Sequence, residues 1–257
     1  MTDEDTGSSP HPLRHLSIIM DGNNRWAALH GLAGIAGHEA GVERIRGVLE
    51  SARGHNIEVV SLFAFSSENW QRPELEVTGL MTLFANYLRK EIEALRSDGV
   101  RLLVMGSRAN FSDSLKELIV EAETATASGS LTLALCVDYG GRWDIVEASR
   151  EVAMQVQLGR LRASDISEGI FSSYLQFRGL PDPDLCIRTG GEERISNFLL
   201  WHLAYTELYV SECFWPDFRP ELLDEAVEEY YRRKRRFGQR NSELQPQLSD
   251  EAERAET

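Results

Sequence analysis

Strand-like apolar runs alternate with amphipathic helical segments along most of the chain, and this alternation constrains the fold more than any other feature. The runs are LSIIM from Leu16, EVVSLFAF from Glu58, VRLLVMG from Val100, LTLALCV from Leu131, LCIR from Leu185 and ELYVS from Glu207. Such alternation is typical of a parallel sheet, because each parallel crossover places a helix against a face of the sheet. We therefore predict a single α/β domain with a mostly parallel six-stranded sheet flanked by helices.

The segment from Leu80 to Leu95 contains the clearest helical stripe. Its apolar side chains recur at spacings of three and four, at Leu80, Leu83, Phe84, Tyr87, Leu88, Ile92 and Leu95. This periodicity is typical of a helix with one buried face. Similar stripes follow Gly37, Ser112, Arg142 and Pro220.

The charge of the chain is strongly acidic. Aspartate and glutamate number 41 against 27 lysines and arginines, for a formal net charge of −14. This balance disfavours a general nucleic-acid binder, whose affinity would come from neutralising phosphates. Polar, acidic segments at residues 1–13 and 239–257 bury too little apolar surface to offset their ordering entropy, so we predict disordered tails flanking a domain at residues 14–238.

The three cysteines, Cys136, Cys186 and Cys213, are scattered and form no CxxC pair. This pattern favours reduced thiols in a cytosol over a disulfide framework or a zinc site. The longest apolar runs are strand-sized, and Met1 to Pro12 lacks the regions of a signal peptide. We expect a cytoplasmic protein.

Polar clusters follow several predicted strands at their carboxyl ends, where open parallel sheets bind ligands. They cover Asp21 to Trp26, Ser66 to Arg72, Asp138 to Arg142 and Arg188 to Ser196. The chain has neither GxxxxGK[ST] nor a GxGxxG that opens a helix, so neither nucleotide motif explains them.

Arginines recur in these clusters at Arg25, Arg72, Arg188 and Arg194. Their forked donors suit phosphate oxygens, although each could instead pair with a nearby acid on the surface. Gly190 and Gly191, taken by themselves, need do no more than turn the chain. The convergence of the arginines favours an anion site.

Asp21 provides a carboxylate near these arginines. Magnesium often takes one or two protein carboxylates together with phosphate oxygens, so Asp21 is a candidate ligand for magnesium on a diphosphate; the alternative is an Asx turn. Glu207 could supply a second acid. His38, near a predicted helix start, could donate to a phosphate.

Several motifs together resemble the cis-prenyltransferases, in particular the bacterial undecaprenyl diphosphate synthase group. They are IIMDGNNRWA, GHEAG, LFAFSSENWQRP, DYGGRWD, IRTGGEERISNFLLWHLAYTELY, WPDF and RRFG, which follow the family's order and spacing from Arg14 to Gly238. The resemblance implies sequential condensation of isopentenyl diphosphate onto an allylic starter such as farnesyl diphosphate. The product would be the polyprenyl carrier lipid for peptidoglycan precursors.

The resemblance also implies roles for individual residues. Asp21 matches the catalytic, magnesium-binding aspartate, Glu207 the second acidic metal residue, and Asn69 the family's proton acceptor. We keep open that Asn69 orients the substrate while a diphosphate oxygen takes the proton, because a neutral amide is a poor base. The remaining substrate-binding positions are Gly22, Asn23, Asn24, Arg25, Trp26, Gly34, His38, Ser66, Ser67, Glu68, Trp70, Arg72, Arg188, Arg194, Ile195 and Ser196.

Further expectations concern the whole molecule. The resemblance implies an apolar tunnel between sheet and helices, which the Leu80 to Leu95 stripe would line where it does not simply pack the core. It also implies a homodimer, a transient membrane contact for product release, and a contribution of Arg236 and Gly238 to the substrate site. A cis-prenyltransferase of different product length and a non-catalytic partner subunit are the alternatives.

Four positions depart from the family's commonest pattern. Asn24 replaces glycine, Gly34 replaces arginine, Asp138 replaces asparagine and Glu193 replaces histidine. The missing guanidinium at position 34 is expected to weaken diphosphate binding. Glu193 adds a negative charge beside the predicted anion site.

Overall fold

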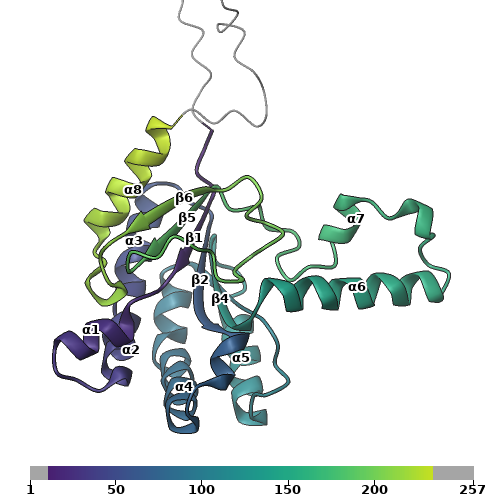
Figure 1. Ribbon diagram of the computed structural model, residues 1–257. Helices are drawn as coiled ribbons and strands as arrows, with labels where there is room; N and C mark the ends of the chain where they lie inside the picture. Colours follow the sequence, from purple (N-terminus) through teal and green to yellow (C-terminus); the bar gives the residue numbers. More distant parts are fainter. Residues whose placement is uncertain (1–10, 234–257) are drawn as a thin grey trace, which may run out of the picture.

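Six parallel strands form one sheet in the computed structural model, which describes residues 11–233. The strands are β1 (His15–Ile19), β2 (Val59–Ser66), β3 (Val100–Met105), β4 (Leu131–Tyr139), β5 (Leu185–Thr189) and β6 (Glu207–Ser211). Their order across the sheet is β3-β4-β2-β1-β5-β6, and every neighbouring pair is parallel (Figure 1). The predicted single α/β domain with a six-stranded sheet is confirmed.

The helices occupy the segments between the strands. They are α1 (Asn23–Leu29), α2 (Gly34–Val42), α3 (Arg44–Gly54), α4 (Glu74–Ser97), α5 (Asp113–Ala125), α6 (Gly141–Gln157), α7 (Glu168–Ser172) and α8 (Pro220–Arg232), with short 3-10 helices η1 (Ser67–Gln71), η2 (Ala163–Asp165) and η3 (Trp215–Asp217). Each predicted apolar stripe lies on a helix. The short helices α1 and α7 and the 3-10 turns have no such stripe and were not predicted.

Local chemistry explains where several helices begin. The Ser112 hydroxyl accepts the Leu115 N–H at 3.3 Å, a side-chain cap at the start of α5. Pro220 occupies the first turn of α8, where its missing N–H leaves no hydrogen bond unmade. Glu74 and Glu76 lie in the first turn of α4, where negative charge complements the helix dipole.

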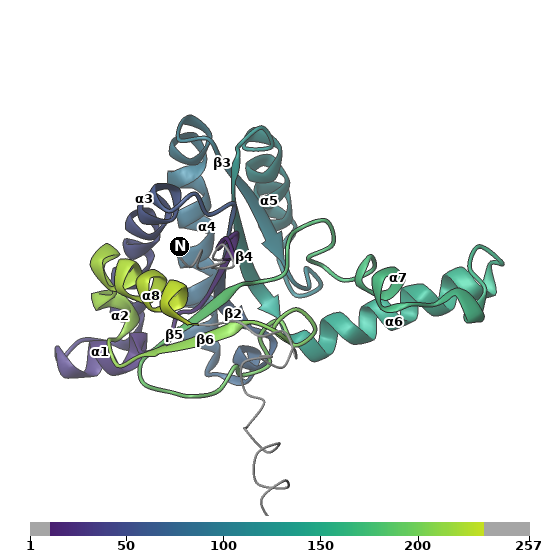
Figure 2. The same cartoon turned by 90° about the horizontal axis from the view of Figure 1, so that it is seen from above.

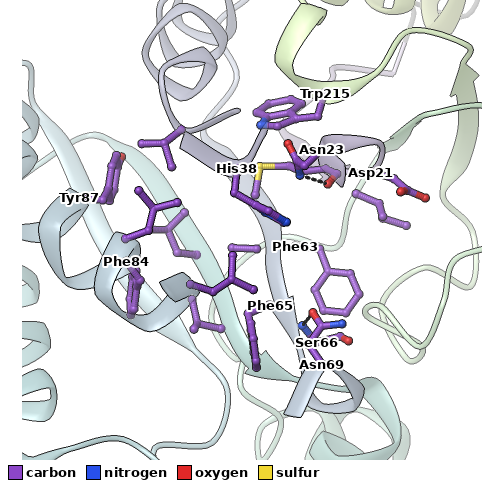
Figure 3. Close-up of a pocket in the computed structure, with 18 of the residues that line it drawn as sticks. Asp21, Asn23, His38, Phe63, Phe65, Ser66, Asn69, Phe84, Tyr87 and Trp215 are labelled. Atoms are coloured by element: carbon purple, nitrogen blue, oxygen red, sulfur yellow. Dashed lines mark hydrogen bonds between the residues drawn. The ribbon is translucent and has the colours of Figure 1, made fainter. Parts of the chain in front are cut away.

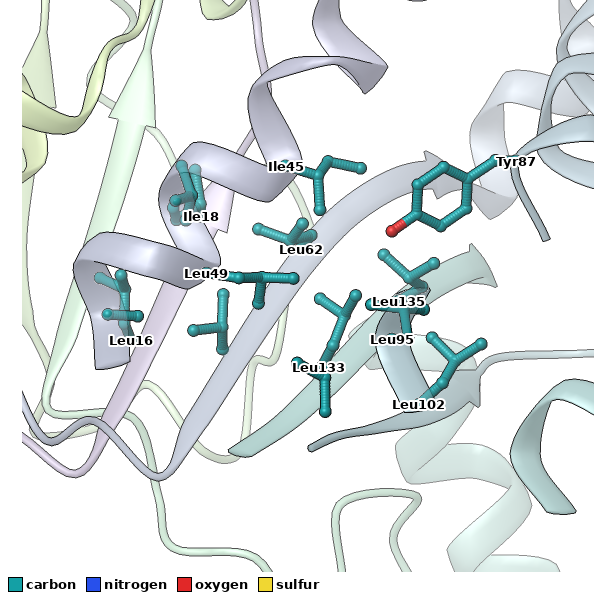
Figure 4. Packing of buried hydrophobic residues seen from close by; sticks show 14 of the residues in the cluster. Leu16, Ile18, Ile45, Leu49, Leu62, Tyr87, Leu95, Leu102, Leu133 and Leu135 are labelled. Carbon is teal, nitrogen blue, oxygen red and sulfur yellow. The ribbon is translucent and has the colours of Figure 1, made fainter. Parts of the chain in front are cut away.

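The two faces of the sheet are covered differently. Helices α3, α4, α5 and α8 pack against one face, where side chains such as Leu16, Leu62 and Leu133 point into a large apolar cluster (Figure 4). The other face carries a smaller cluster that includes Phe177 from the connection before β5 and Phe198 from the connection after it. These connections have enough large apolar side chains to cover the sheet without forming a long helix.

Helix α6 extends away from the sheet, with the short α7 beside it (Figures 1 and 2). Its side chains Val146, Met154 and Leu158 are exposed, although large apolar residues on a helix usually face a core. Within residues 11–233, no helix combines the length and the apolar composition needed to cross a bilayer.

The described chain begins to pack close to the predicted domain boundary. Leu13, assigned above to the amino-terminal tail, is only 2% exposed, and its N–H donates to the Tyr231 hydroxyl at 3.3 Å. The rest of the predicted tails, at residues 1–10 and 239–257, lies outside the described residues. Arg236 and Gly238 lie outside them too.

Candidate active site

The pairing of β1 with β5 brings two oppositely charged side chains together at the carboxyl edge of the sheet. Ile19 lies opposite Arg188 in this register, and Asp21 follows β1 by two residues. Arg188 Nη2 donates to Asp21 Oδ2 at 2.7 Å. The Asp21 backbone is held as well, because its N–H donates to Thr189 Oγ1 at 2.9 Å and its carbonyl oxygen accepts the Trp215 N–H at 3.0 Å.

The surroundings of Asp21 favour its ionised form. Burial alone would raise the pKa of this half-buried carboxyl, but the hydrogen bond and charge of Arg188, the Gly22 N–H at 2.6 Å and the Arg25 guanidinium outweigh it. The pKa of Asp21 is therefore below its ordinary value. Gly22 itself adopts φ +102°, and a β-carbon there would lie 2.5 Å from Phe214 Cδ1, so only glycine fits this turn.

Arg188 is the most buried of the predicted arginines, with 7% of its surface exposed. Its Nη1 donates to Ser196 Oγ at 2.7 Å and to the Arg194 carbonyl oxygen. The Arg194 guanidinium points elsewhere: it is exposed and pairs with Glu192. Glu192 also lies 3.8 Å from Arg25, whose guanidinium covers the Phe214 ring. Exposed guanidiniums at this edge are thus paired with acids that an incoming anion could replace.

The second predicted substrate loop forms the 3-10 helix η1. Asn69 Oδ1 accepts the Ser66 N–H at 2.9 Å in a capping box, so the side-chain carbonyl of Asn69 already has a partner. Asn197 Nδ2 donates to Glu68 Oε1 at 2.7 Å and ties η1 to the loop after β5. Arg72 follows η1, and its Nη1 donates to Glu76 Oε1 at 2.8 Å.

A cavity of about 310 Å³ opens beside these polar groups and extends between the sheet and helices α2, α3 and α4 (Figure 3). One end is polar, with Asp21, Asn23, His38 and Asn69 facing it. Apolar side chains line the rest, namely Val42, Ile45, Leu80, Met81, Leu83, Phe84, Tyr87, Leu135 and Val137. The pairing of β2 with β4 shifts register around Ala64, beside the cavity, and such irregularities redirect side chains near binding sites.

His38 lies at the polar end of the cavity and is largely buried. Burial is the main cause that lowers its pKa to about 4, and the positive charge of Arg72 acts in the same direction. The imidazole is therefore neutral at pH 7. Its Nε2 is buried without a hydrogen-bond partner among the described residues, so it is free to meet a ligand atom.

The structure brings many of the predicted site residues to this cavity. Eight of them line it, namely Asp21, Asn23, His38, Ser66, Asn69, Arg72, Arg188 and Ser196. The others, Gly22, Asn24, Arg25, Trp26, Gly34, Ser67, Glu68, Trp70, Arg194 and Ile195, belong to the same loops but are not part of its lining. Ile195 instead packs against the cluster on the opposite face of the sheet.

Glu207 is not near this site. It begins β6 and lies opposite Leu185, which in turn lies opposite Leu16 at the start of β1. Asp21 comes five residues after Leu16, which corresponds to about 16 Å along a strand. Glu207 instead accepts a hydrogen bond from Arg233 at 3.1 Å. Within one chain, Glu207 and Asp21 cannot ligate the same ion.

Other residues join the site without having been predicted. Thr189 holds the Asp21 backbone, Glu76 holds Arg72, and Trp215 lines the cavity while its indole N–H donates to the Gly41 carbonyl oxygen at 2.8 Å. Trp215 lies in the WPDF motif, which was a usable signal. Thr189 lies in the IRTGG motif, and Glu76 follows Arg72 by four residues, the spacing of neighbours on a helix, so the sequence held a signal for both.

Glu193 and Asp138 are two of the four positions that depart from the family pattern, and the structure shows the surroundings of both. Glu193 is exposed, and it is the neighbouring Glu192 that pairs with Arg25 and Arg194. Asp138, the second-last residue of β4, has φ +53°, a conformation that aspartate and asparagine tolerate better than most residues. Its side chain is 4% exposed, and in the described part of the chain Oδ2 has no hydrogen-bond partner.

The side chains at the polar end of the cavity offer few ligands for a magnesium ion. Within residues 11–233, no group of three or more histidine, cysteine, aspartate or glutamate side chains is arranged to hold a metal. Asp21, with 30% of its side chain exposed, is the carboxylate at the polar end of the cavity. A single carboxylate fits the way in which magnesium binds together with substrate phosphates, and it does not fit a protein cage.

Comparison with known proteins agrees with this geometry. The family model described as putative undecaprenyl diphosphate synthase matches residues 19–238. The chain belongs to this family. The match includes all of the loops that form the candidate site and the whole sheet except the first residues of β1.

Curated relatives align over most of their length. A ditrans,polycis-undecaprenyl-diphosphate synthase ((2E,6E)-farnesyl-diphosphate specific) from Pseudomonas aeruginosa is 50% identical over 233 residues, covering 90% of this chain and 93% of the relative. A synthase of the same name from Aliivibrio fischeri is 44% identical over 238 residues, covering 92% and 93%.

Solved structures of this family share the fold. Lavandulyl diphosphate synthase from Lavandula x intermedia, in complex with dimethylallyl diphosphate, gives a TM-score of 0.85 at 35% identity and covers 88% of this chain and 98% of that one. A probable undecaprenyl diphosphate synthase from Campylobacter jejuni gives 0.74 at 31% identity, covering 89% and 99%.

The Asp138→Asn variant is expected to stabilise this family member at neutral pH. Burial is the main cause that raises the pKa of Asp138, and it outweighs the opposing contacts with Trp70 and Asn110. The Asp138 carboxyl therefore binds its proton more tightly in the folded state than in the unfolded state. Ionisation of Asp138 lowers the stability of the folded state at neutral pH, and this loss becomes smaller as pH falls. Urea unfolding should show a gain of about 1 kcal/mol near neutral pH that shrinks on acidification.

The exposed Asp113 supplies the control for this measurement, since its side chain is 94% exposed. Asp113 lies in the first turn of α5 and pairs with Lys116 on the surface, so Asp113→Asn should cost no more than about 0.5–1 kcal/mol and should give no gain in stability near neutral pH. A loss of stability in Asp138→Asn near neutral pH would contradict the explanation from burial.

Proposed function

We propose that the protein is a magnesium-dependent undecaprenyl diphosphate synthase, which condenses isopentenyl diphosphate repeatedly onto farnesyl diphosphate with cis geometry. The observation that carries this proposal is a charged cluster, centred on Asp21 and Arg188, that opens directly into an apolar cavity. A prenyl diphosphate has the same two parts, a charged head and an apolar chain. The names of the curated relatives support the starter and the product.

The charged end of the site suits the step that breaks an allylic carbon–oxygen bond. This step leaves negative charge on the departing diphosphate, which fixed donors stabilise best in a partly buried site. Arg25, Arg72, Arg188 and the neutral His38 are the donors around the polar end. Asp21 would hold magnesium, which supplies further positive charge to the diphosphate oxygens.

The proton released when the new double bond forms needs an acceptor, and the geometry argues against Asn69 as that base. Its carbonyl oxygen accepts the Ser66 N–H, and its amide nitrogen can only donate. We assign Asn69 to orienting the substrate through this amide. A diphosphate oxygen then takes the proton.

The apolar part of the cavity would receive the growing chain. At about 310 Å³ it is near the lower limit of typical ligand pockets. Chain length therefore depends on how far helices α3 and α4 give way, and a synthase of different product length is the second candidate. The Lavandula relative was solved in complex with dimethylallyl diphosphate, and this complex supports the second candidate.

We also propose a cytoplasmic homodimer that touches the membrane transiently when it releases product. Exposed apolar side chains on α6 and on the edge strand β6, including Met154 and Leu208, support a second copy as partner. Asp21 and Glu207 would have to come from different copies to share an ion. A monomer by light scattering would remove the dimer from the proposal.

The transient membrane contact is supported by a different set of residues. Leu29, Leu32 and Leu75 are exposed on the elements around the cavity mouth, and such apolar side chains suit a lipid surface.

The central experiment measures elongation directly. Purified protein is incubated with farnesyl diphosphate, labelled isopentenyl diphosphate and magnesium, and the extracted products are sized. A product of undecaprenyl length is expected, with no elongation when magnesium is chelated. Shorter or longer products would support the second candidate, and no elongation would leave a non-catalytic partner subunit.

The Asp21→Asn variant separates the role of Asp21 in chemistry from its role in folding. The amide keeps the size of the side chain and an acceptor for Arg188 but loses the charge that would bind magnesium. We expect kcat to fall by about a hundredfold or more. Because the buried Arg188 loses its counter-charge, the unfolding temperature should also fall by several degrees, and circular dichroism at the assay temperature should show that the variant is still folded. Asp113→Asn is the matched control. Turnover within about twofold of the wild type would remove Asp21 from the mechanism.

A further inference from the structure

Asn24 and Gly34, two departures from the family pattern, touch each other. Asn24 lies in the first turn of α1 and Gly34 begins α2. A β-carbon at position 34 would lie 2.6 Å from Asn24 Oδ1 and 3.3 Å from its Cγ. Gly34 does not have a positive φ, so an added side chain at this position would meet the side chain of Asn24, which would have to move, and not a backbone restriction.

The same Asn24 side chain reaches a third element. Its Nδ2 donates to Glu76 Oε1 on α4 at 3.3 Å, and the same oxygen accepts Arg72 Nη1 at 2.8 Å. Burial alone would raise the pKa of Glu76, but the bonds from Asn24 and Arg72 outweigh it and lower the pKa. Glu76 therefore carries its charge and binds both partners at once.

Arg72 and Asn24 are placed differently with respect to the cavity. Arg72 lines its polar end near His38, whereas Asn24 is exposed and not part of the lining. Asn24 therefore contacts groups of the protein on both sides: the surface of Gly34 and the carboxylate that holds Arg72. From this position Asn24 is better placed to support Arg72, the cationic donor, than to contact a diphosphate directly.

We propose that Asn24 and Gly34 are a matched pair that positions Arg72, through Glu76, for the allylic diphosphate. This inference rests on the proposed function. The two departures are then one coupled change, because the carboxamide of Asn24 occupies the space that a longer side chain at position 34 would need. Asn24 is a positioning residue, and Arg72 is the cation that would contact the diphosphate at the polar end of the cavity.

The first test measures whether Asn24 and Glu76 act on the same step. Steady-state kinetics compare Asn24→Ala, Glu76→Gln and the double variant with the wild type, with farnesyl diphosphate as the varied substrate. Each single variant should raise KM for farnesyl diphosphate about threefold to tenfold, with a smaller change in kcat, because a bond to a charged group is lost. The double variant should be no worse than the more severe single variant. Fully additive effects, or no effect of Asn24→Ala, would overturn the proposal.

The second test measures the steric match and needs no turnover. Gly34→Ala is introduced into the wild type and into Asn24→Gly, and thermal unfolding of all variants is followed. The alanine should lower the unfolding temperature in the wild type and leave it unchanged in Asn24→Gly. An equal loss in both backgrounds would show that Asn24 does not restrict position 34.

Gly54→Ala is the matched control, since a β-carbon there meets nothing within 4 Å. In the wild type and in Asn24→Gly, Gly54→Ala should leave KM for farnesyl diphosphate unchanged. It should also change the unfolding temperature by the same amount in both backgrounds. Failure of the wild type to elongate farnesyl diphosphate would count against the proposed function alone, because the unfolding test still decides whether the pair is matched.

Discussion

A buried guanidinium must be neutralised, and the need of Arg188 for a counter-charge organises the edge of the sheet where the candidate site lies. Removing one charge of such a pair leaves the other buried and costs several kcal/mol. Asp21 supplies the counter-charge at 2.7 Å, and its own backbone is fixed by Thr189 and Trp215. The first and fifth strands, the loop after β6 and the start of α1 therefore depend on one ion pair.

The parallel register explains why chemistry and chain accommodation meet at this place. Carboxyl ends of parallel strands lie at one edge, so Asp21 after β1, Asn69 in η1 after β2 and Arg188 near the end of β5 meet in the same volume. The helices that cover the sheet leave an apolar cavity beginning at that edge. A charged head group and an apolar tail then bind in one orientation, because reversing the molecule would bury charge among leucines.

Much of the fold was predictable because periodicity reports burial directly. All six strands were predicted from apolar runs, and each lies within two residues of its run. The apolar stripes located the long helices, but α4 begins at Glu74, six residues before the predicted segment. The order β3-β4-β2-β1-β5-β6 was not predictable, since it depends on packing between segments far apart. The short helices were not predicted for a related reason: α1 and η1 are too short for a stripe, and η1 is held in part by a long-range contact, the hydrogen bond from Asn197 to Glu68.

By itself, the sequence determined the α/β class, the strands and the clustering of acids, amides and arginines at strand ends, because these follow from local patterns and from the polarity of parallel strands. Only the tertiary structure decided which of those residues meet. It joined Asp21 to Arg188, Asn24 to Gly34 and Asn24 to Glu76, and it placed Glu207 at the far edge. Such pairs depend on strand order and helix placement, which the packing of the whole chain determines.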